Sequence, residues 1–206
     1  MLRDNRKNIQ YLKSYELNRI REVIDDGRLS LRDKCIMLLL LYTGLRSSDI
    51  AALKMESIDW AGDRILVRQQ KTDEALILPL SPVVGNSIYD YLSMERPNTN
   101  SNSLFLTSTS HNPPLASASI SAIVAKVFAV AGIRQNPGDR KGTHIFRHNL
   151  ASSLLSKGVP GPVIAQTLGH STPESLEPYL RADFAHLKEC SISIEDFPLN
   201  KGVLSV

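Results

Sequence analysis

Four short segments concentrate side chains that can bind a phosphate group or move a proton. The first is Thr43-Gly44-Leu45-Arg46-Ser47-Ser48-Asp49-Ile50, in which Arg46 follows a glycine and precedes an expected helix. An arginine there can present its planar guanidinium to two phosphate oxygens, and Asp49 can orient it. Taken alone, the segment is more often a turn with a surface arginine, because arginine is usually exposed.

The second and third segments add an amine and two imidazoles. Lys71 lies in the polar turn KTDE, where a lysine can reach a ligand and donate a proton, although most turn lysines are simply solvated. His144, Arg147 and His148 share one face of an expected helix by their i, i+3, i+4 spacing. At a helix N-terminus they form a plausible phosphate site. His148 has apolar neighbours, so it can also be a structural histidine bonded to the backbone.

The spacing of His144 and His148 also fits a pair of zinc ligands. However, the glutamate of a His-Glu-x-x-His motif is absent, and Arg147 between them would repel a cation. We therefore expect no metal.

The fourth segment is Leu168-Gly169-His170-Ser171, followed nine residues after His170 by Tyr179. Gly169 permits a tight turn before His170. A phenol titrates near pH 10, so Tyr179 needs cationic neighbours and a proton acceptor to act as a nucleophile. The first three segments can supply both. A lone tyrosine here would otherwise be a residue at the edge of the core.

The elements that must position these segments form a mainly α-helical fold with one small antiparallel hairpin. Capping residues, breakers and apolar spacing predict helices over 14–27, 30–44, 47–55, 82–94, 117–131, 144–157, 160–168, 173–180 and 184–190. Ser14, Ser30 and Thr143 are the expected N-caps. The runs 64–69 and 75–80 predict the hairpin, and 104–106 a short strand. Helix 30–44 is apolar on all sides, which indicates a buried central helix.

Composition limits the class of protein. The chain has 206 residues, 42% of them hydrophobic, which fits one domain or two small ones and excludes general disorder. A net charge of +3 suits nucleic-acid binding only if the cations gather on one face. Cys35 and Cys190 form no Cys-x-x-Cys pair, so a zinc ribbon is not expected. The first ten residues lack the apolar core of a signal peptide, and the longest apolar run, 35–42, is far shorter than the ~20 residues that span a bilayer, so we expect a cytoplasmic protein.

Together, the four segments resemble the tyrosine recombinase, or phage integrase, family. TGLRSSDIAAL (43–53) is similar to its first arginine box, with Asp49 where the family usually has glutamate. QKTDEALILPL (70–80) is similar to its lysine hairpin, HIFRHNLASSLLSKGV (144–159) to its His-x-x-Arg-His box, and LGHSTPESLEPYLR (168–181) to its Leu-Gly-His box and tyrosine. The resemblance covers about residues 14–185. The helical domain that usually precedes this one is missing, so we expect an excised domain or a shortened copy.

The resemblance implies a mechanism without metal or cofactor. Tyr179 would attack the scissile phosphate to give a 3′-phosphotyrosyl intermediate, with Arg46 and Arg147 on the non-bridging oxygens. His144 would accept the tyrosine proton, Lys71 would protonate the leaving 5′-oxygen, and His170 would donate to the phosphate. Asp49 and His148 would support these groups.

The resemblance also implies partners and a division of the chain. The partner would be double-stranded DNA, bound by a tetramer that is a monomer when free. We expect a flexible segment over 1–13, the catalytic domain over 14–191, and a tail over 192–206 that docks on a neighbouring protomer. The basic loop 134–141, with Arg140 and Lys141, is either an additional contact to the DNA backbone or a solvated loop.

Two other functions fit part of the pattern. A type IB topoisomerase shares the tyrosine chemistry but relaxes supercoils as a monomer, and histidine at both 144 and 170 favours the recombinase. A non-catalytic DNA-binding module is suggested by the helix-turn-helix-like spacing of 158–180. That module would explain neither Arg46 nor Lys71.

Overall fold

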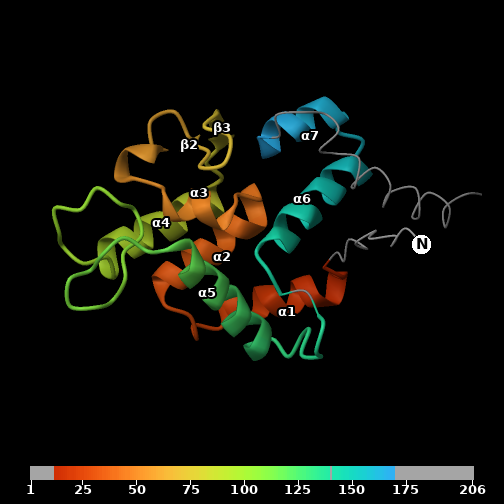
Figure 1. The fold of residues 1–206 in the computed structure, drawn as a ribbon, viewed down its shortest axis with the longest axis horizontal. Helices are drawn as coiled ribbons and strands as arrows, with labels where there is room; N and C mark the ends of the chain where they lie inside the picture. Colours follow the sequence, from red (N-terminus) through yellow and green to blue (C-terminus); the bar gives the residue numbers. More distant parts are fainter. Residues whose placement is uncertain (1–11, 140, 170–206) are drawn as a thin grey trace, which may run out of the picture.

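The computed structural model describes residues 12–139 and 141–169, and this part of the chain is mainly helical with one small antiparallel sheet (Figure 1). The fold class predicted from the sequence is therefore confirmed. In chain order the elements are α1 (Ser14–Asp25), α2 (Leu31–Thr43), α3 (Ser47–Ala51), the 3-10 turn η1 (Met55–Ser57), β1 (Ile58–Asp59), β2 (Arg64–Arg68), β3 (Ala75–Pro79), α4 (Pro82–Met94), α5 (Ser117–Val130), α6 (His144–Ser156) and α7 (Gly161–Leu168).

Helix α2 forms the centre of the core, as its apolar sequence predicts. Ser30 caps its start by accepting a hydrogen bond from the Asp33 amide at 3.1 Å, and Gly44 ends it in the left-handed conformation. The helix contacts α3, α4, α5 and α6, so it is surrounded by protein on most sides. Side chains with no solvent exposure lie along it at Cys35, Ile36, Met37, Leu39 and Leu40.

The sheet has the strand order β1-β2-β3, with both pairs antiparallel. Ile65 pairs with Leu78 and Val67 with Leu76, so alternate residues of β2 and β3 are buried on one face. The hairpin predicted from the sequence is confirmed. The two-residue strand β1 was not predicted, because two residues carry no readable alternation.

Segment 104–106 does not form the strand expected from its sequence. The Leu104 amide donates to the carbonyl of Leu53, whereas the carbonyl of Phe105 accepts from Leu115, so successive residues pair with different segments. The same pairing explains why α3 ends at Ala51 and not near residue 55: the backbone of Leu53 turns to meet Leu104. Tertiary contacts here override local helical preference.

Two of the three predicted caps are also corrected. Helix α1 begins at Ser14, but the cap position is Lys13, whose amide donates to Glu16 Oε2 at 2.8 Å. Thr143 occupies the cap position of α6, yet its side chain accepts no capping hydrogen bond. Its backbone is already in the helical region, whereas a capping side chain needs an extended backbone, and its carbonyl accepts from Phe146 instead.

Helices α6 and α7 carry a small apolar cluster of their own beside the main core. Ala151, Ile164, Ala165 and Leu168 are its buried members. In Figure 1, α7 lies next to the hairpin of β2 and β3, and α7 contacts β3. The predicted helices 173–180 and 184–190 lie outside the described residues. None of the described helices combines the length and apolar character needed to cross a membrane.

Candidate active site

Arg46 is placed by the turn that joins α2 to α3. The Thr43 hydroxyl donates to the Leu39 carbonyl at 2.6 Å and accepts from the Leu45 amide at 3.2 Å, which fixes the backbone just before Arg46. Gly44, between them, has φ 61°, a conformation that other residues adopt only with strain. Arg46 itself occupies the N-cap position of α3. The glycine of the first segment is therefore what turns the arginine toward the site.

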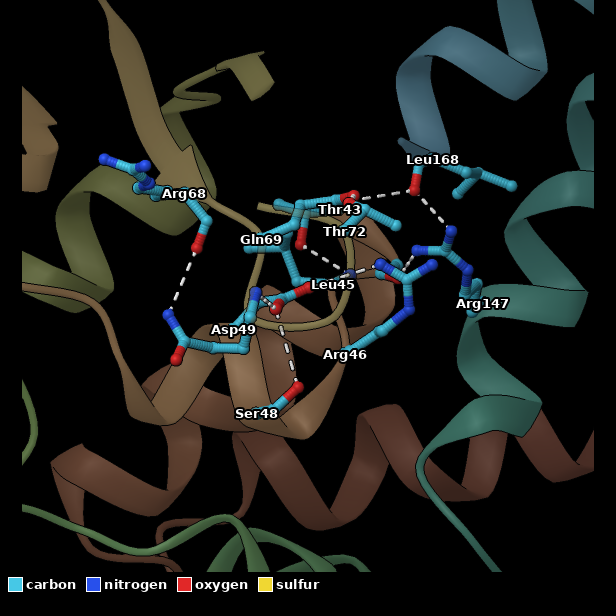
Figure 2. A network of polar contacts seen from close by, with 12 residues as sticks. Thr43, Leu45, Arg46, Ser48, Asp49, Arg68, Gln69, Thr72, Arg147 and Leu168 are labelled. Carbon is cyan, nitrogen blue, oxygen red and sulfur yellow. Dashed lines mark hydrogen bonds and ion pairs between the residues drawn. The ribbon is translucent and has the colours of Figure 1, made fainter. Parts of the chain in front are cut away.

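Asp49 forms an ion pair with Arg46 that leaves donors of the guanidinium available for a ligand. Asp49 Oδ2 lies 3.7 Å from Arg46 Nη1, which is an ion pair longer than a hydrogen bond. Its other oxygen, Oδ1, accepts the amide of Gln70 at 2.9 Å (Figure 2). Among the described residues, Arg46 Nη1 has no hydrogen-bond partner. The Arg46 side chain is only 15% exposed and Nη1 itself is buried, so this donor is available only to an oxygen that enters the site.

Arg147 joins two loops that are far apart in the sequence. Its Nη1 donates to the Gly44 carbonyl at 3.2 Å, and its Nη2 donates to the Leu168 carbonyl. The side chain is only 4% exposed. A guanidinium has five N–H donors, and these two bonds use one donor on each Nη atom. Arg147 thus brings the start of α6, the end of α2 and the end of α7 together.

The hairpin turn is fastened to this cluster by Gln69, which is fully buried. Gln69 Nε2 donates to the Leu168 carbonyl at 3.2 Å, the same oxygen that Arg147 bonds (Figure 2). Gln69 Oε1 accepts from the Thr72 hydroxyl at 2.8 Å. Lys71 lies in the turn between them and is exposed.

Two glycines permit these close approaches. A Cβ added to Gly169 would overlap the carboxamide of Gln69, and Gly169 has φ 61°. A Cβ added to Gly44 would lie 3.0 Å from Leu150 Cδ2 and 3.3 Å from Leu168 Cδ2. The glycines of the Thr-Gly-Leu-Arg and Leu-Gly-His segments are therefore needed for packing as well as for turning.

Partial burial and three cations from three different elements lower the pKa of His144. Partial burial lowers the pKa of its imidazole, and the positive charges of Arg147, Arg46 and Lys71 lower that pKa further. The side chain still reaches solvent at the first turn of α6. An imidazole kept neutral in this way can accept a proton. The shift also means that all three cations lie within electrostatic reach of one ring.

The described part of the predicted site is thus brought together. Arg46, Asp49, Lys71, His144 and Arg147 converge from the α2–α3 turn, the hairpin turn and the start of α6. His148 is half-buried one turn along α6 from His144, and Lys141 is half-buried just before that helix. Three further predicted residues lie outside the described residues: Arg140, His170 and Tyr179.

No group of three His, Cys, Asp or Glu side chains suited to holding a metal ion occurs in 12–139 or 141–169. The His144–His148 pair, considered above for zinc, therefore gains no third protein ligand there.

Gln69 and Thr72 are the site residues that the sequence analysis missed. A signal for Gln69 was present: Ile65 and Val67 are inward-facing residues of β2, so position 69 continues the buried face. A polar side chain there must find a buried partner. The sequence could not name that partner, because the Leu168 carbonyl is 99 residues away.

Comparisons with solved structures define the class of this fold. A crystal structure of XerA recombinase superimposes with a TM-score of 0.72 at 22% identity, covering 93% of this chain and 66% of that one. A crystal structure of XerH recombinase in a post-cleavage complex with palindromic difH substrate gives 0.73 at 23% identity, covering 89% and 53%. The fold is that of a tyrosine recombinase catalytic domain.

The sequence comparisons give the family. A model of the phage integrase family matches residues 10–186. The integrase/recombinase y4gC of Sinorhizobium fredii is 35% identical over 82% of this chain and 86% of its own length, and the tyrosine recombinase XerA of Pyrococcus furiosus is 31% identical over 86% and 59%. This chain belongs to the phage integrase family. It spans most of y4gC but less than two thirds of XerA and of two other Sinorhizobium relatives, y4rF and y4rA.

Proposed function

We propose that this chain carries out site-specific DNA recombination by cutting and rejoining strands through a 3′-phosphotyrosyl bond. The observation that carries the proposal is the convergence of Arg46, Lys71 and Arg147 around His144. These cations come from three elements, which are joined by the hydrogen bond of Arg147 to the Gly44 carbonyl and by that of the Gln70 amide to Asp49. Partial burial and the charges of these cations together lower the pKa of the His144 imidazole. A cluster of cations beside a proton acceptor suits a phosphate whose charge increases during reaction.

The proposed cleavage step transfers two protons, one from the substrate-attacking tyrosine to the protein's base and one from the protein's acid to the leaving group. The Tyr179 oxygen attacks the phosphorus, its proton passes to His144, and the new bond is Tyr179 Oη–P. The P–O5′ bond breaks, and the leaving oxygen takes a proton from Lys71. Arg46, Arg147 and His170 donate to the non-bridging oxygens, and Asp49 and His148 support them. The reverse attack by a 5′-hydroxyl restores the phosphodiester without any cofactor.

The partner in this proposal is double-stranded DNA. Solved structures of similar fold include a lambda integrase dimer bound to a COC′ core site and the XerH complexes with difH substrate. We propose that this chain likewise binds duplex DNA, as a tetramer during recombination and as a monomer when free. Lys141, together with Arg140, would add contacts to the DNA backbone beside the start of α6.

The proposed division of the chain follows the same logic. Residues 14–191 would form the catalytic domain, and 192–206 would be a tail that docks on a neighbouring protomer. The flexible leading segment expected over 1–13 would end before Leu12. Leu12 and Lys13 already contribute to the fold, through burial of Leu12 and the Lys13 amide at the start of α1. We propose a cytoplasmic location, in contact with the DNA substrate.

Covalent capture tests this proposal without knowing the target site in advance. Fragments of the source genome are incubated with the chain. Detergent then denatures the protein, and the fragments that stay covalently linked to it are sequenced. The proposal predicts one recurrent site that the wild-type chain retains and that Tyr179→Phe does not. Retention by Tyr179→Phe, or a random set of fragments, would contradict it. Placing two copies of the recovered site on one plasmid then tests recombination against simple relaxation of supercoils.

A further inference from the structure

Lys71 lies on a turn that is exposed to solvent, yet the proposed reaction needs its amine at one defined place. The backbone on either side of it is tied to both arginine elements. On one side, the Gln70 amide donates to Asp49 Oδ1 at 2.9 Å, which connects the turn to Arg46. On the other side, the contact runs from Thr72, which follows Lys71, to the side chain of Gln69, which precedes the segment 70–80.

The Gln69 carboxamide uses both of its ends. Its Nε2 donates to the Leu168 carbonyl at 3.2 Å, and its Oε1 accepts from the Thr72 hydroxyl at 2.8 Å. Gln69 is fully buried, so these bonds are formed away from competing water. The Leu168 carbonyl also accepts from Arg147, which makes this oxygen a shared point of the hairpin turn and α6 (Figure 2).

From this geometry we infer that Thr72 and Gln69 are positioning residues that hold the Lys71 amine in register with Arg147. The inference rests on the proposed function, since it concerns how Lys71 is placed for proton donation. Thr72 directly follows Lys71, and fixing its hydroxyl on Gln69 fixes the backbone that carries the lysine. Gln69 transmits the position of α7 and Arg147 to that backbone through the Leu168 carbonyl.

The remaining contacts of the turn do not provide this connection. Arg68 and Asp73 form an exposed two-bond ion pair at 2.6 and 2.7 Å, which closes the hairpin on itself and reaches no other element within 12–139 and 141–169. The backbone bonds of Gln69 to Glu74 and Asp73 likewise stay within the hairpin. Among the described residues, the hydrogen bond from the Gln69 side chain to the Leu168 carbonyl is thus the contact by which a side chain of the hairpin turn reaches α7.

The experiment uses the chemistry of the leaving group to separate positioning of Lys71 from general folding. Cleavage of a suicide duplex is timed with two substrates, one with the natural 5′-oxygen and one with sulfur at that bridging position. A thiolate leaves without protonation because a thiol is far more acidic than an alcohol. A variant that impairs only proton donation is therefore slow on the oxygen substrate and restored on the sulfur substrate.

Thr72→Val removes the hydroxyl and keeps the branched shape. We expect it to cleave the oxygen substrate about tenfold more slowly than wild type, and the sulfur substrate at the wild-type rate. Thr72→Ser, which keeps the hydroxyl, should match wild type on both. Lys71→Ala should show a larger loss of about 10²–10⁴-fold on oxygen with the same restoration. Gln69→Met should be restored only in part, since it also removes a bond to the carbonyl that Arg147 shares.

The matched control is Gln70→Ala, which alters an exposed glutamine of the same turn and keeps its backbone amide. Within the described part of the chain, its side chain donates to the Arg68 carbonyl at 3.4 Å and to no other group. It should leave both rates unchanged. Wild-type rates for Thr72→Val on both substrates, or an equal loss on both, would overturn the inference while leaving the proposed function intact. If Lys71→Ala cleaves the sulfur substrate as slowly as the oxygen substrate, Lys71 is not the proton donor, and the inference is overturned. A wild-type chain that forms no adduct with either substrate would overturn the proposed function, and the inference with it.

Discussion

The buried carboxylate of Asp49 lies 3.7 Å from the Arg46 guanidinium and at the same time accepts the amide of Gln70. One side chain therefore connects the arginine of the α2–α3 turn to the hairpin that carries Lys71. Asp49 keeps the carboxylate of the glutamate that is usual in the family, on a side chain one methylene shorter.

Removing the charge of Asp49 should weaken catalysis more than folding. Asp49→Asn can still accept the Gln70 amide, but it loses the attraction that orients Arg46. We expect cleavage of a suicide substrate to slow by about 10–100-fold, which corresponds to about 1–3 kcal/mol of lost transition-state stabilisation. Ser48→Ala is the control, because its hydroxyl lies 3.5 Å from Asp49 Oδ1, at the limit of a hydrogen bond. Equal cleavage rates for the two variants would argue against an orienting role.

Alanine substitutions at Gly44 and Gly27 can separate the cost of backbone strain from the cost of crowding by a new methyl group. Both have positive φ, at 61° and 78°, but a Cβ at Gly27 meets nothing within 4 Å. Gly27→Ala should therefore cost only the left-handed strain of about 1–2 kcal/mol in the free energy of unfolding, with unchanged DNA cleavage. Gly44→Ala should cost more and also slow cleavage, because the new methyl group presses on Leu150, Leu168 and the backbone of Arg147. Urea unfolding and suicide-substrate cleavage measure the two effects, and identical behaviour would contradict the packing role.

Glu16 and Arg134 form a buried ion pair that fastens α1 to the loop after α5. Glu16 Oε1 accepts from Arg134 Nε at 2.8 Å, and the two side chains are 5% and 8% exposed. Glu16→Ala leaves the arginine buried without its carboxylate, so we expect a loss of about 3–5 kcal/mol in the free energy of unfolding. Glu22→Ala, at an exposed position of the same helix, should change it by less than about 0.5 kcal/mol. A small effect of Glu16→Ala in urea unfolding would contradict the assignment.

The same pair gives stability a defined pH dependence. Burial alone would raise the pKa of Glu16. The hydrogen bonds from Arg134 and from the Lys13 amide, and the positive charges of the Arg134 and Lys13 side chains, lower that pKa overall. Because the folded-state pKa lies below the unfolded value, the contribution is fully present above the unfolded pKa. It is lost as the pH falls through the lowered pKa. The stability difference between wild type and Glu16→Ala should therefore shrink below about pH 4, and a constant difference down to pH 2 would contradict this.

The lowered pKa of His144 predicts the acidic limb of the cleavage reaction. If neutral His144 accepts the tyrosine proton, the rate rises with pH through its pKa, with a midpoint below the ordinary value of 6.5. Removing a nearby positive charge should raise that pKa, so NMR titration of His144 in Lys71→Met should give a higher midpoint than in wild type. Lys157→Met, at the far end of α6, is the control and should leave it unchanged. A His144 midpoint unaffected by Lys71→Met would show that the lysine does not face the imidazole.

Much of the fold and site was readable from local patterns. The apolar run of α2 with Ser30 and Gly44 at its ends, and the i, i+3 spacing of His144 and Arg147, depend on residues close in sequence. What could not be read depends on contacts between distant segments. Helix α3 stops early because Leu53 pairs with Leu104, and Thr143 does not cap because the chain enters α6 already in helical conformation.

The role of Gln69 shows the same limit within the site. Its burial follows from strand alternation, but its partner is a backbone carbonyl of α7 that carries no sequence signal. The roles of side chains could be proposed from motif and spacing, whereas the carbonyl oxygens that hold Arg147 required the folded chain.

The most direct test of the account is to identify the amino acid that becomes joined to DNA. The chain is reacted with a suicide duplex carrying the captured site, digested with trypsin and nuclease, and analysed by mass spectrometry. We predict a nucleotide on the peptide 158–181, in which Tyr179 is the sole tyrosine, and no such adduct from Tyr179→Phe. An adduct on any other residue, or undiminished attachment in Tyr179→Phe, would contradict the account.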